Sequence, residues 1–358
     1  MAKKADHHVL VADIGGTNLG VAIFSQSGKD RFEPVCHHAY HTRQIRNIPA
    51  FFRRYLRREG RRLDPKVQSA CIDFAGPINS DRSTASLTNL DLTFTATEVI
   101  EATGIENLTL LNDFEAVGFG VEVLMANKPE AFVRLSRSGK LPPRSGVKPT
   151  ALVLGAGTGL GTTVLIHDPV SGRYRPLPAE GGHVDFGAVE ELDFRIAQWI
   201  RAHRNDSPDN PLNRERVVSG RGLANVFEAL SELEPHLGGA EMRKTVFSAK
   251  VPDRPAIISK NAGRDTLCRR ALDIWLRSYA RAAKNSVILP MAPGGVFLAG
   301  GVAAKILPEM QSGTFMKEFL RCDIPNIRAI LKRIPVFVVT DYRIGLYGCA
   351  NVAVNGLV

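Results

Sequence analysis

The sequence of 358 residues is poor in cysteine and aromatic residues and has no long apolar segment. Its five cysteines are scattered and form no Cys-x-x-Cys pair, so we expect neither a disulfide framework nor structural zinc. The uncharged run at residues 150–166 contains four glycines and four threonines, whereas a membrane helix needs about 20 mostly apolar residues. Residues 1–8 lack the apolar core of a signal peptide. We therefore expect a cytoplasmic protein with no membrane partner.

Two common nucleotide-binding motifs are also missing. The glycine-rich run at 155–161 has leucine at position 160, where a dinucleotide fingerprint needs its third glycine. The Gly-Lys pairs at 28–29 and 139–140 lack the hydroxyl residue that follows lysine in a phosphate-binding P-loop. The sequence thus supports neither a nicotinamide dehydrogenase nor a P-loop kinase.

The remaining composition is that of a globular protein, with 44% hydrophobic and 23% charged residues and a net charge of +10. At this length we expect two domains or one large one. Six arginines lie between positions 53 and 62, all on one half of a predicted helix at about 47–60, with Phe52, Tyr55, Leu56 and Leu63 on the other half. A solvated helix face explains this pattern better than a nucleic-acid or membrane patch, because no aromatic residues interleave with the arginines.

A strand, a glycine- and threonine-rich turn and a second strand occur twice, about 140 residues apart. The first unit has strands at 9–14 and 19–24, and the second has strands at 151–154 and 162–167. Each tip offers backbone N–H groups and threonine hydroxyls without bulky side chains, which suits phosphate oxygens. A tight turn alone would explain one such hairpin, but two of them indicate a paired phosphate site.

Further strands at 68–74, 108–111, 295–299 and 336–340 alternate with helices at 188–204 and 265–289 and a helix from Gly345 onward. This alternation predicts an α/β architecture.

Six motifs occur in a fixed order along the chain. They are DIGGTN at 13–18, LNDFEA at 111–116, GAGTGLG at 155–161, EGGHVDF at 180–186, ERVVSG at 215–220 and LAGG at 298–301. With them the sequence resembles the bacterial-type glucokinase family of the actin-like sugar kinases over nearly its whole length. The resemblance implies an α/β fold in which two ribonuclease-H-like domains face each other across a cleft. It divides the chain into a small domain, residues 1–122 plus 336–358, and a large domain, residues 123–335.

The resemblance also implies ATP and Mg²⁺ as cofactors, glucose as acceptor, a role in the first step of glycolysis and a homodimer. The ATP-binding residues would be Ala12, Asp13, Ile14, Gly15, Gly16, Thr17, Asn18, Gly157, Thr158, Gly159, Gly300 and Gly301. The glucose-binding residues would be Gly76, Asn89, Asn112, Asp113, Glu180, His183 and Glu215. Asp113 would be the general base, and Asp13 would orient Mg²⁺ through water.

Several alternatives stay open at this stage. Asp113 could be a helix N-cap, His183 a core histidine and Glu215 an ordinary surface residue. A sugar sensor without catalysis, another ATPase of the superfamily, or a kinase that uses polyphosphate are the competing functions. No CxCGxxGC follows His183, which disfavours the zinc-containing branch. Two departures are unexplained: Leu90 and Asp91 follow Asn89 where relatives have an aromatic residue, and Asp73 stands in an otherwise apolar strand.

Overall fold

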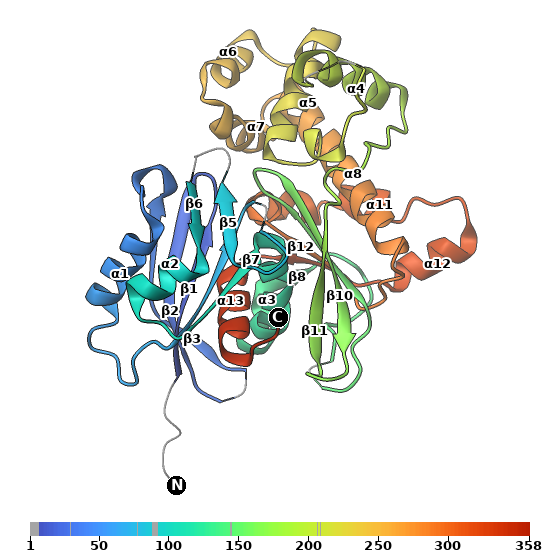
Figure 1. Ribbon diagram of the computed structural model, residues 1–358. Coiled ribbons are helices and arrows are strands. Elements are labelled where there is room, and N and C mark those ends of the chain that lie inside the picture. The colour runs from blue at the N-terminus through green and yellow to red at the C-terminus, as the bar shows by residue number, and fades with distance from the viewer. Residues whose placement is uncertain are drawn as a thin grey trace.

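The first sheet of the protein has five strands in the order β3-β2-β1-β4-β7. Its strands are β1 (His7–Ile14), β2 (Asn18–Gln26), β3 (Phe32–His41), β4 (Ser69–Phe74) and β7 (Asn107–Asn112). The first three are antiparallel, and β4 and β7 run parallel to β1. The computed structural model (Figure 1) describes residues 7–28, 30–76, 78–87, 92–143, 145–205, 207 and 209–358.

A second sheet repeats this arrangement in the order β11-β10-β9-β12-β13, with β8 (Phe132–Arg134) added at its edge. Its strands are β9 (Ala151–Ala156), β10 (Leu160–Asp168), β11 (Arg173–Ala179), β12 (Val296–Ala299) and β13 (Val336–Val339). Here too an antiparallel trio is extended by parallel strands. The predicted α/β fold with two related domains is thereby confirmed, and the two glycine-rich turns are the β1–β2 and β9–β10 connections.

Alternating side chains on the strands face different layers, as the two-residue period of a strand requires. In β1, Val9 and Val11 point into a cluster shared by both sheets, while Leu10, Ala12 and Ile14 point to the outer face. That outer face is covered by α1 (Ile48–Glu59) and α2 (Ala96–Thr103), near the small hairpin of β5 (Thr84–Leu87) and β6 (Leu92–Thr95). In α1, Phe52 and Tyr55 are buried and its four arginines are exposed, as predicted, whereas Arg61 and Arg62 lie beyond the end of the helix.

The outer face of the second sheet is covered by an extensive helical layer. Its longer members are α4 (Glu191–Arg204), α5 (Gly220–Leu233), α6 (Ala240–Ser248), α7 (Arg254–Asn261) and α8 (Thr266–Ile288). Its shorter members are α9 (Gly301–Lys305), α10 (Leu307–Gln311), α11 (Thr314–Phe319) and α12 (Pro325–Arg333). The helices expected at 188–204 and 265–289 are therefore present as α4 and α8. Among the helices of the described residues, none is long and apolar enough to span a membrane.

Two helices, α3 (Asp113–Asn127) and α13 (Ile344–Asn355), lie side by side between the two sheets (Figure 1). Each follows the last parallel strand of its own sheet, yet it packs mainly on the other sheet. Helix α3 leaves β7 and packs on β10 and β11, whereas α13 comes after β13 and packs on β1 and β4. The two halves of the chain have thus exchanged these helices.

This exchange changes the expected division of the chain. The strand at 336–340 was assigned to the small domain, but β13 pairs with β12 and β8 in the second sheet. Only α13, which comes after that strand, packs on the first sheet. A boundary between residues 122 and 123 would also cut through α3. The physical reason is that the last strand of each half pairs in its own sheet, while the helix after it packs on the other sheet.

Candidate active site

The tip of the β1–β2 hairpin is held in place by the segment that follows β3. The Gly15 N–H donates to the Asn18 carbonyl over 2.9 Å, which closes the turn. Buried Thr42 donates its hydroxyl to the Gly15 carbonyl (2.7 Å) and its N–H to the Thr17 carbonyl (3.0 Å). Gly16, Thr17 and Asn18 remain exposed. The tip therefore presents a fixed backbone to a ligand.

Two of the predicted ATP residues contribute no side chain to this tip. Ala12 and Ile14 are fully buried in the outer core of the first sheet. Both are paired with β2 and β4, whereas Asp13 between them faces the opposite way and is half-buried.

The tip of the β9–β10 hairpin meets the start of helix α5. Gly157 donates its N–H to the Gly159 carbonyl (2.9 Å) and accepts from the Gly220 N–H (2.8 Å). Thr158 at the tip is exposed. Gly300, at the end of β12, has a φ of +85°, and a Cβ there would lie 2.6 Å from the Ala156 carbonyl oxygen. Only glycine fits such a position, so the predicted adenosine segment lies directly beside this second hairpin.

Asp113 is the first residue of α3, immediately after β7. The N-cap of this helix is Asn112, whose Oδ1 accepts from the Phe114 N–H (2.9 Å) and the Glu115 N–H (3.4 Å). Asp113 Oδ1 accepts from the same Phe114 N–H at 2.9 Å. The capping role that was an alternative for Asp113 thus belongs mainly to Asn112, whose amide Nδ2 remains available to a sugar hydroxyl.

The Asp113 carboxyl lies among other acidic groups. Burial, together with the negative charge of Asp13, raises its pKa to about 6, and Glu180 adds to the effect. Burial also raises the pKa of Asp13. Asp13 is the penultimate residue of β1, and Glu180 directly follows β11, an edge strand of the second sheet. The fold therefore brings two other predicted site residues, Asp13 and Glu180, within electrostatic range of Asp113.

Asp73 lies behind this acidic group. It is opposite Asp13 in the parallel β1–β4 pair and is 1% exposed. The Cys349 thiol donates to its Oδ2 over 3.3 Å, while Oδ1 has no hydrogen-bond partner among the described residues. Burial and the neighbouring Asp13 charge hold the pKa of Asp73 well above its usual range. The charge that was unexplained in the sequence thus belongs to the base of the site, next to Asp13.

The aromatic ring of Phe114 connects α3 to the second hairpin. Gly155 and Gly161 are paired across β9 and β10, and a Cβ on either would collide with this ring. Because both positions are glycine, there is room for the Phe114 ring between them. Because Phe114 directly follows Asp113, this contact fixes the carboxyl relative to the β9–β10 tip.

The predicted sugar residues Glu180 and His183 lie together on an irregular loop that follows β11. The His183 side chain is 59% exposed and its Nε2 lies 3.7 Å from Glu180 Oε2. A core role for this histidine is therefore excluded. The His183 N–H also donates to the Glu180 carbonyl (3.0 Å), which holds the two residues in one turn.

Glu215 links this loop to the second hairpin. Its N–H donates to the Gly182 carbonyl (3.0 Å), and its Oε2 accepts from the Leu160 N–H (2.9 Å). It is therefore no ordinary surface residue. Arg221 places Nη2 3.5 Å from Glu215 Oε1 and donates from Nε to the Thr158 carbonyl (3.3 Å). Nothing in the sequence singled out Arg221, because it joins Glu215 to the Thr158 tip only after the chain has folded.

The last two predicted sugar residues lie near the β5–β6 hairpin. A Cβ on Gly76 would lie 2.6 Å from the Ser86 carbonyl oxygen, so glycine permits a close approach of the two segments. Asn89, together with Leu90 and Asp91, lies outside the described residues.

Asp13 suits the way proteins hold Mg²⁺ beside a nucleotide. The ion usually keeps several waters and takes one or two carboxylates plus substrate phosphates. Within the described ranges, no group of three or more His, Cys, Asp or Glu residues could hold a metal. A single half-buried carboxylate beside a phosphate hairpin matches this mode and does not match a protein-only metal cage.

Comparisons with known proteins point to one family for the whole chain. The family profile described as Glucokinase matches residues 10–356. The glucokinase of Psychromonas ingrahamii is 32% identical over 346 residues, covering 95% of this chain and 94% of that protein. The glucokinase of Nostoc sp. is 29% identical over 353 residues, covering 96% and 97% of the two chains.

Solved structures share the fold. A glucokinase from an Antarctic psychrotroph superposes with a TM-score of 0.75 at 25% identity, covering 97% of this chain and 99% of that one. The glucokinase of Balamuthia mandrillaris, solved in complex with glucose, gives a TM-score of 0.78 at 23% identity, covering 97% and 94%. A ROK-family glucokinase from Streptomyces griseus, solved with glucose and AMPPNP, gives 0.63 at 17%, covering 97% and 99%.

Proposed function

The chain belongs to the Glucokinase family, and we propose that it transfers the γ-phosphoryl group of ATP to the 6-hydroxyl of glucose, giving glucose 6-phosphate and ADP. The observation that carries this proposal is the position of Asp113. Its carboxyl lies at the β7–α3 junction, within electrostatic range of Asp13 on the nucleotide side and Glu180 on the sugar side. A base between two substrates is what phosphoryl transfer to a hydroxyl requires.

Asp113 is proposed as the general base. An acceptor hydroxyl must lose its proton as it attacks the γ-phosphorus, while most of the catalysis comes from positioning and charge neutralisation. A pKa of about 6 leaves Asp113 largely ionised at neutral pH and raises its proton affinity above that of an ordinary aspartate. The Phe114 contact with the β9–β10 hairpin holds this base near the proposed phosphate site.

The nucleotide is proposed to lie between the two hairpin tips. The two hairpin tips, with Gly16 to Asn18 exposed in the first and Thr158 exposed in the second, would donate backbone N–H groups to its phosphates. Gly300 and Gly301 would let the adenosine lie against backbone. Asp13 would hold the Mg²⁺ that accompanies ATP through water, and this ion would neutralise charge on the phosphates. Closure of the two halves of the chain would exclude water from the reaction.

A donor-by-sugar matrix on the purified protein tests the proposed function. ATP with Mg²⁺ should support phosphorylation of glucose, with a higher kcat/KM than for mannose or fructose, and EDTA should abolish turnover. Activity with polyphosphate but not with ATP would contradict the donor assignment. N-Acetylmannosamine as the best acceptor would contradict the sugar assignment, and ATP hydrolysis that no sugar stimulates would favour the ATPase alternative.

His183 provides a prediction specific to the sugar. The His183→Ala variant should raise the KM for glucose at least tenfold and leave the KM for ATP within about twofold, since the imidazole is proposed to touch only the sugar. A tenfold change corresponds to about 1.4 kcal/mol, the size of one lost hydrogen bond. Steady-state kinetics with each substrate varied in turn would measure both constants. Equal increases in both would show that His183 acts on the fold and not on the sugar.

The raised pKa of Asp113 predicts the pH dependence of the reaction. A general base works only when ionised, so kcat/KM for glucose should be constant above pH 7 and fall about tenfold per pH unit below a pKa of about 6. An aspartate with an ordinary pKa near 3.9 would leave the rate unchanged down to about pH 5. Initial rates from pH 5 to 8.5, with protein folding verified at each pH, distinguish the two outcomes.

The assembly and location of the protein are proposed from the family resemblance alone. We propose a homodimer located in the cytoplasm. Light scattering coupled to size-exclusion chromatography would give the mass in solution, and a monomer across the micromolar range would contradict the dimer.

A further inference from the structure

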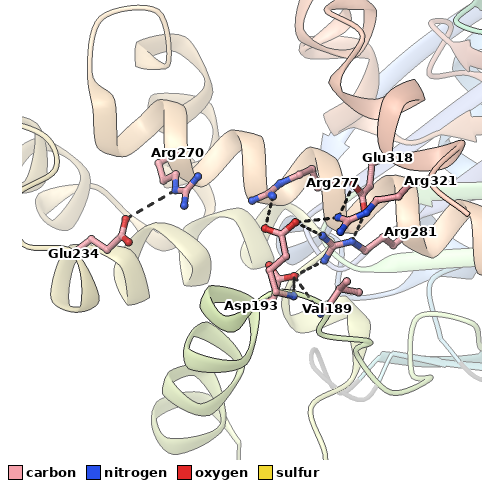
Figure 2. A network of polar contacts seen from close by, with 9 residues as sticks. Val189, Asp193, Glu234, Arg270, Arg277, Arg281, Glu318 and Arg321 are labelled. Carbon is pink, nitrogen blue, oxygen red and sulfur yellow. Dashed lines mark hydrogen bonds and ion pairs between the residues drawn. The ribbon is translucent and has the colours of Figure 1, made fainter. Parts of the chain in front are cut away.

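A buried cluster of ion pairs holds the start of α4 against α8 and α11 (Figure 2). At its centre is Arg281 on α8, which is 5% exposed and lies between the carboxylates of Asp193 and Glu318. Arg281 Nε donates to Glu318 Oε1 over 2.6 Å, and Nη1 donates to Asp193 Oδ2. Both carboxylates are as deeply buried as the arginine. The cluster therefore fixes three helices at one point.

Glu190, the residue before α4, receives a second set of arginines. Arg277 Nη1 donates to its Oε2 at 2.7 Å, and Arg321 Nη1 donates to its Oε1 at 3.0 Å. Arg277 lies one turn before Arg281 on α8, while Arg321 follows α11. Three arginines and three carboxylates thus balance each other in the cluster.

The cluster is connected directly to the loop that carries Glu180 and His183. Besides Arg281, Asp193 Oδ2 accepts from the Val189 N–H (3.2 Å) and the Glu190 N–H (3.1 Å). These amides belong to the last residues of the loop before α4. Figure 2 shows Val189 and Arg281 converging on the Asp193 carboxylate. One side chain therefore joins the end of the sugar loop to α8.

The other side of the loop is bound to the segment of Glu215. Three backbone hydrogen bonds join the two segments. The Glu215 N–H donates to the Gly182 carbonyl, and the Arg214 N–H donates to the Val184 carbonyl. In the opposite direction, the Phe186 N–H donates to the Leu212 carbonyl. Between these bonds and Asp193 the loop has no regular secondary structure. Its position therefore depends on two anchors, one at 182–186 and one at 189–190.

Helix α8 also holds the neighbouring functional segments. Trp275 Nε1 donates to the Ser219 carbonyl at the end of the ERVVSG motif (2.9 Å). Tyr279 donates its hydroxyl to the Leu154 carbonyl in the first strand of the second hairpin (3.0 Å). Within two turns, α8 thus contacts the end of the ERVVSG motif, strand β9 of the second hairpin and, through Arg281, the 180–190 loop.

We propose that Asp193 and Arg281 are positioning residues for glucose binding, which hold the 180–190 loop in register with Glu215 and the second hairpin through α8. This inference rests on the proposed function. Buried ion pairs frequently add little net stability because desolvation offsets their attraction. The cluster therefore serves mainly to fix the position of the 180–190 loop, and the positions of Glu180 and His183 depend on that loop.

The test is the Asp193→Ala variant, which removes the acceptor shared by Val189, Glu190 and Arg281. The KM for glucose should rise about five- to twentyfold, with kcat within threefold and the KM for ATP within twofold of the parent. Independently of activity, hydrogen exchange of the Val189 and Glu190 amides should accelerate at least tenfold. If Asp193→Ala fails to fold, the Glu190→Gln variant replaces it, because Glu190 lies at the half-exposed edge of the cluster. This variant should raise the glucose KM two- to fivefold.

The matched control is Glu228→Gln. Glu228 on α5 is also buried between two arginines, Arg204 and Arg254, but none of these residues contacts the sugar loop. This variant should lower the thermal midpoint and leave the glucose KM and the two loop amides unchanged. An equal rise in glucose KM in the control, or unaltered exchange and KM in the Asp193 and Glu190 variants, would overturn the positioning role. A parent protein that does not phosphorylate glucose would instead refute the proposed function, and the exchange measurement would still decide the role of Asp193.

Discussion

The Asp113→Asn variant is expected to lose about 10²–10⁴-fold in kcat, the usual cost of removing a general base. Asparagine keeps the size of the side chain and one acceptor oxygen, but it cannot take the proton of the sugar hydroxyl. The helix start should survive, because Asn112 caps α3 with its own Oδ1. Glucose affinity should stay within about tenfold, or ~1.4 kcal/mol, since the other sugar contacts remain.

Steady-state kinetics and calorimetric titration with glucose would measure the two quantities separately. The variant should also lose the acidic limb of the pH profile, because the group that titrates near 6 is gone. A kcat within threefold of the parent would remove Asp113 from the mechanism. The protein would then phosphorylate glucose without Asp113 as its base.

The Gly348→Ala variant is expected to destabilise the protein strongly, although alanine is the better helix former. A Cβ on Gly348 of α13 would overlap the Ala116 carbonyl oxygen of α3, and one on Gly120 of α3 would overlap the Ile344 carbonyl oxygen of α13. The two helices therefore touch backbone to backbone. Alanine gains about 1 kcal/mol of helix propensity, but overpacking costs about 1–3 kcal/mol or more. Because the clashing atom belongs to a rigid backbone, we expect a net loss of about 2 kcal/mol.

The midpoint of urea unfolding measures this effect, and Gly263→Ala is its control. Gly263 is exposed, and a Cβ there would meet nothing within 4 Å. Activity of Gly348→Ala should fall as well, since α3 begins with Asp113. An unchanged midpoint would mean that α3 and α13 can move apart freely, contrary to the packing described above.

The hairpins and the local motifs could be predicted because their signals lie within a few residues of one another. Strand alternation and the glycine-rich tips at 15–18 and 157–159 were sufficient to predict both hairpins, and the strand at 108–111 was sufficient to place Asp113 at a strand end. Phosphate binding by the hairpins and catalysis by Asp113 stay predictions. The role of Asn112 as the N-cap was missed because either residue could cap the helix. The end of strand β7 could not be located from the sequence to within one residue, so either Asn112 or Asp113 could begin the helix.

The parts that could not be predicted depend on contacts between distant residues. The Asp193–Arg281 pair joins residues 88 positions apart, and Cys349 reaches Asp73 over 276 positions. The exchange of α3 and α13 has no local signal either, because both helices are apolar around most of their circumference. A small domain that takes up residues 336–358 therefore fits α13, which packs on the first sheet, but does not fit β13, which pairs in the second.

The exchanged helices have a consequence for synthesis of the protein on the ribosome. The inner face of the first sheet, with Val9, Val11 and Cys71, is covered by α13. Proteins are made from the N-terminus, and domains generally fold as they emerge. Here the first sheet waits for residues 344–355 and stays apolar on one face while more than two hundred residues are translated. The inner face of the first sheet therefore reaches its final packing only after α13 has been made.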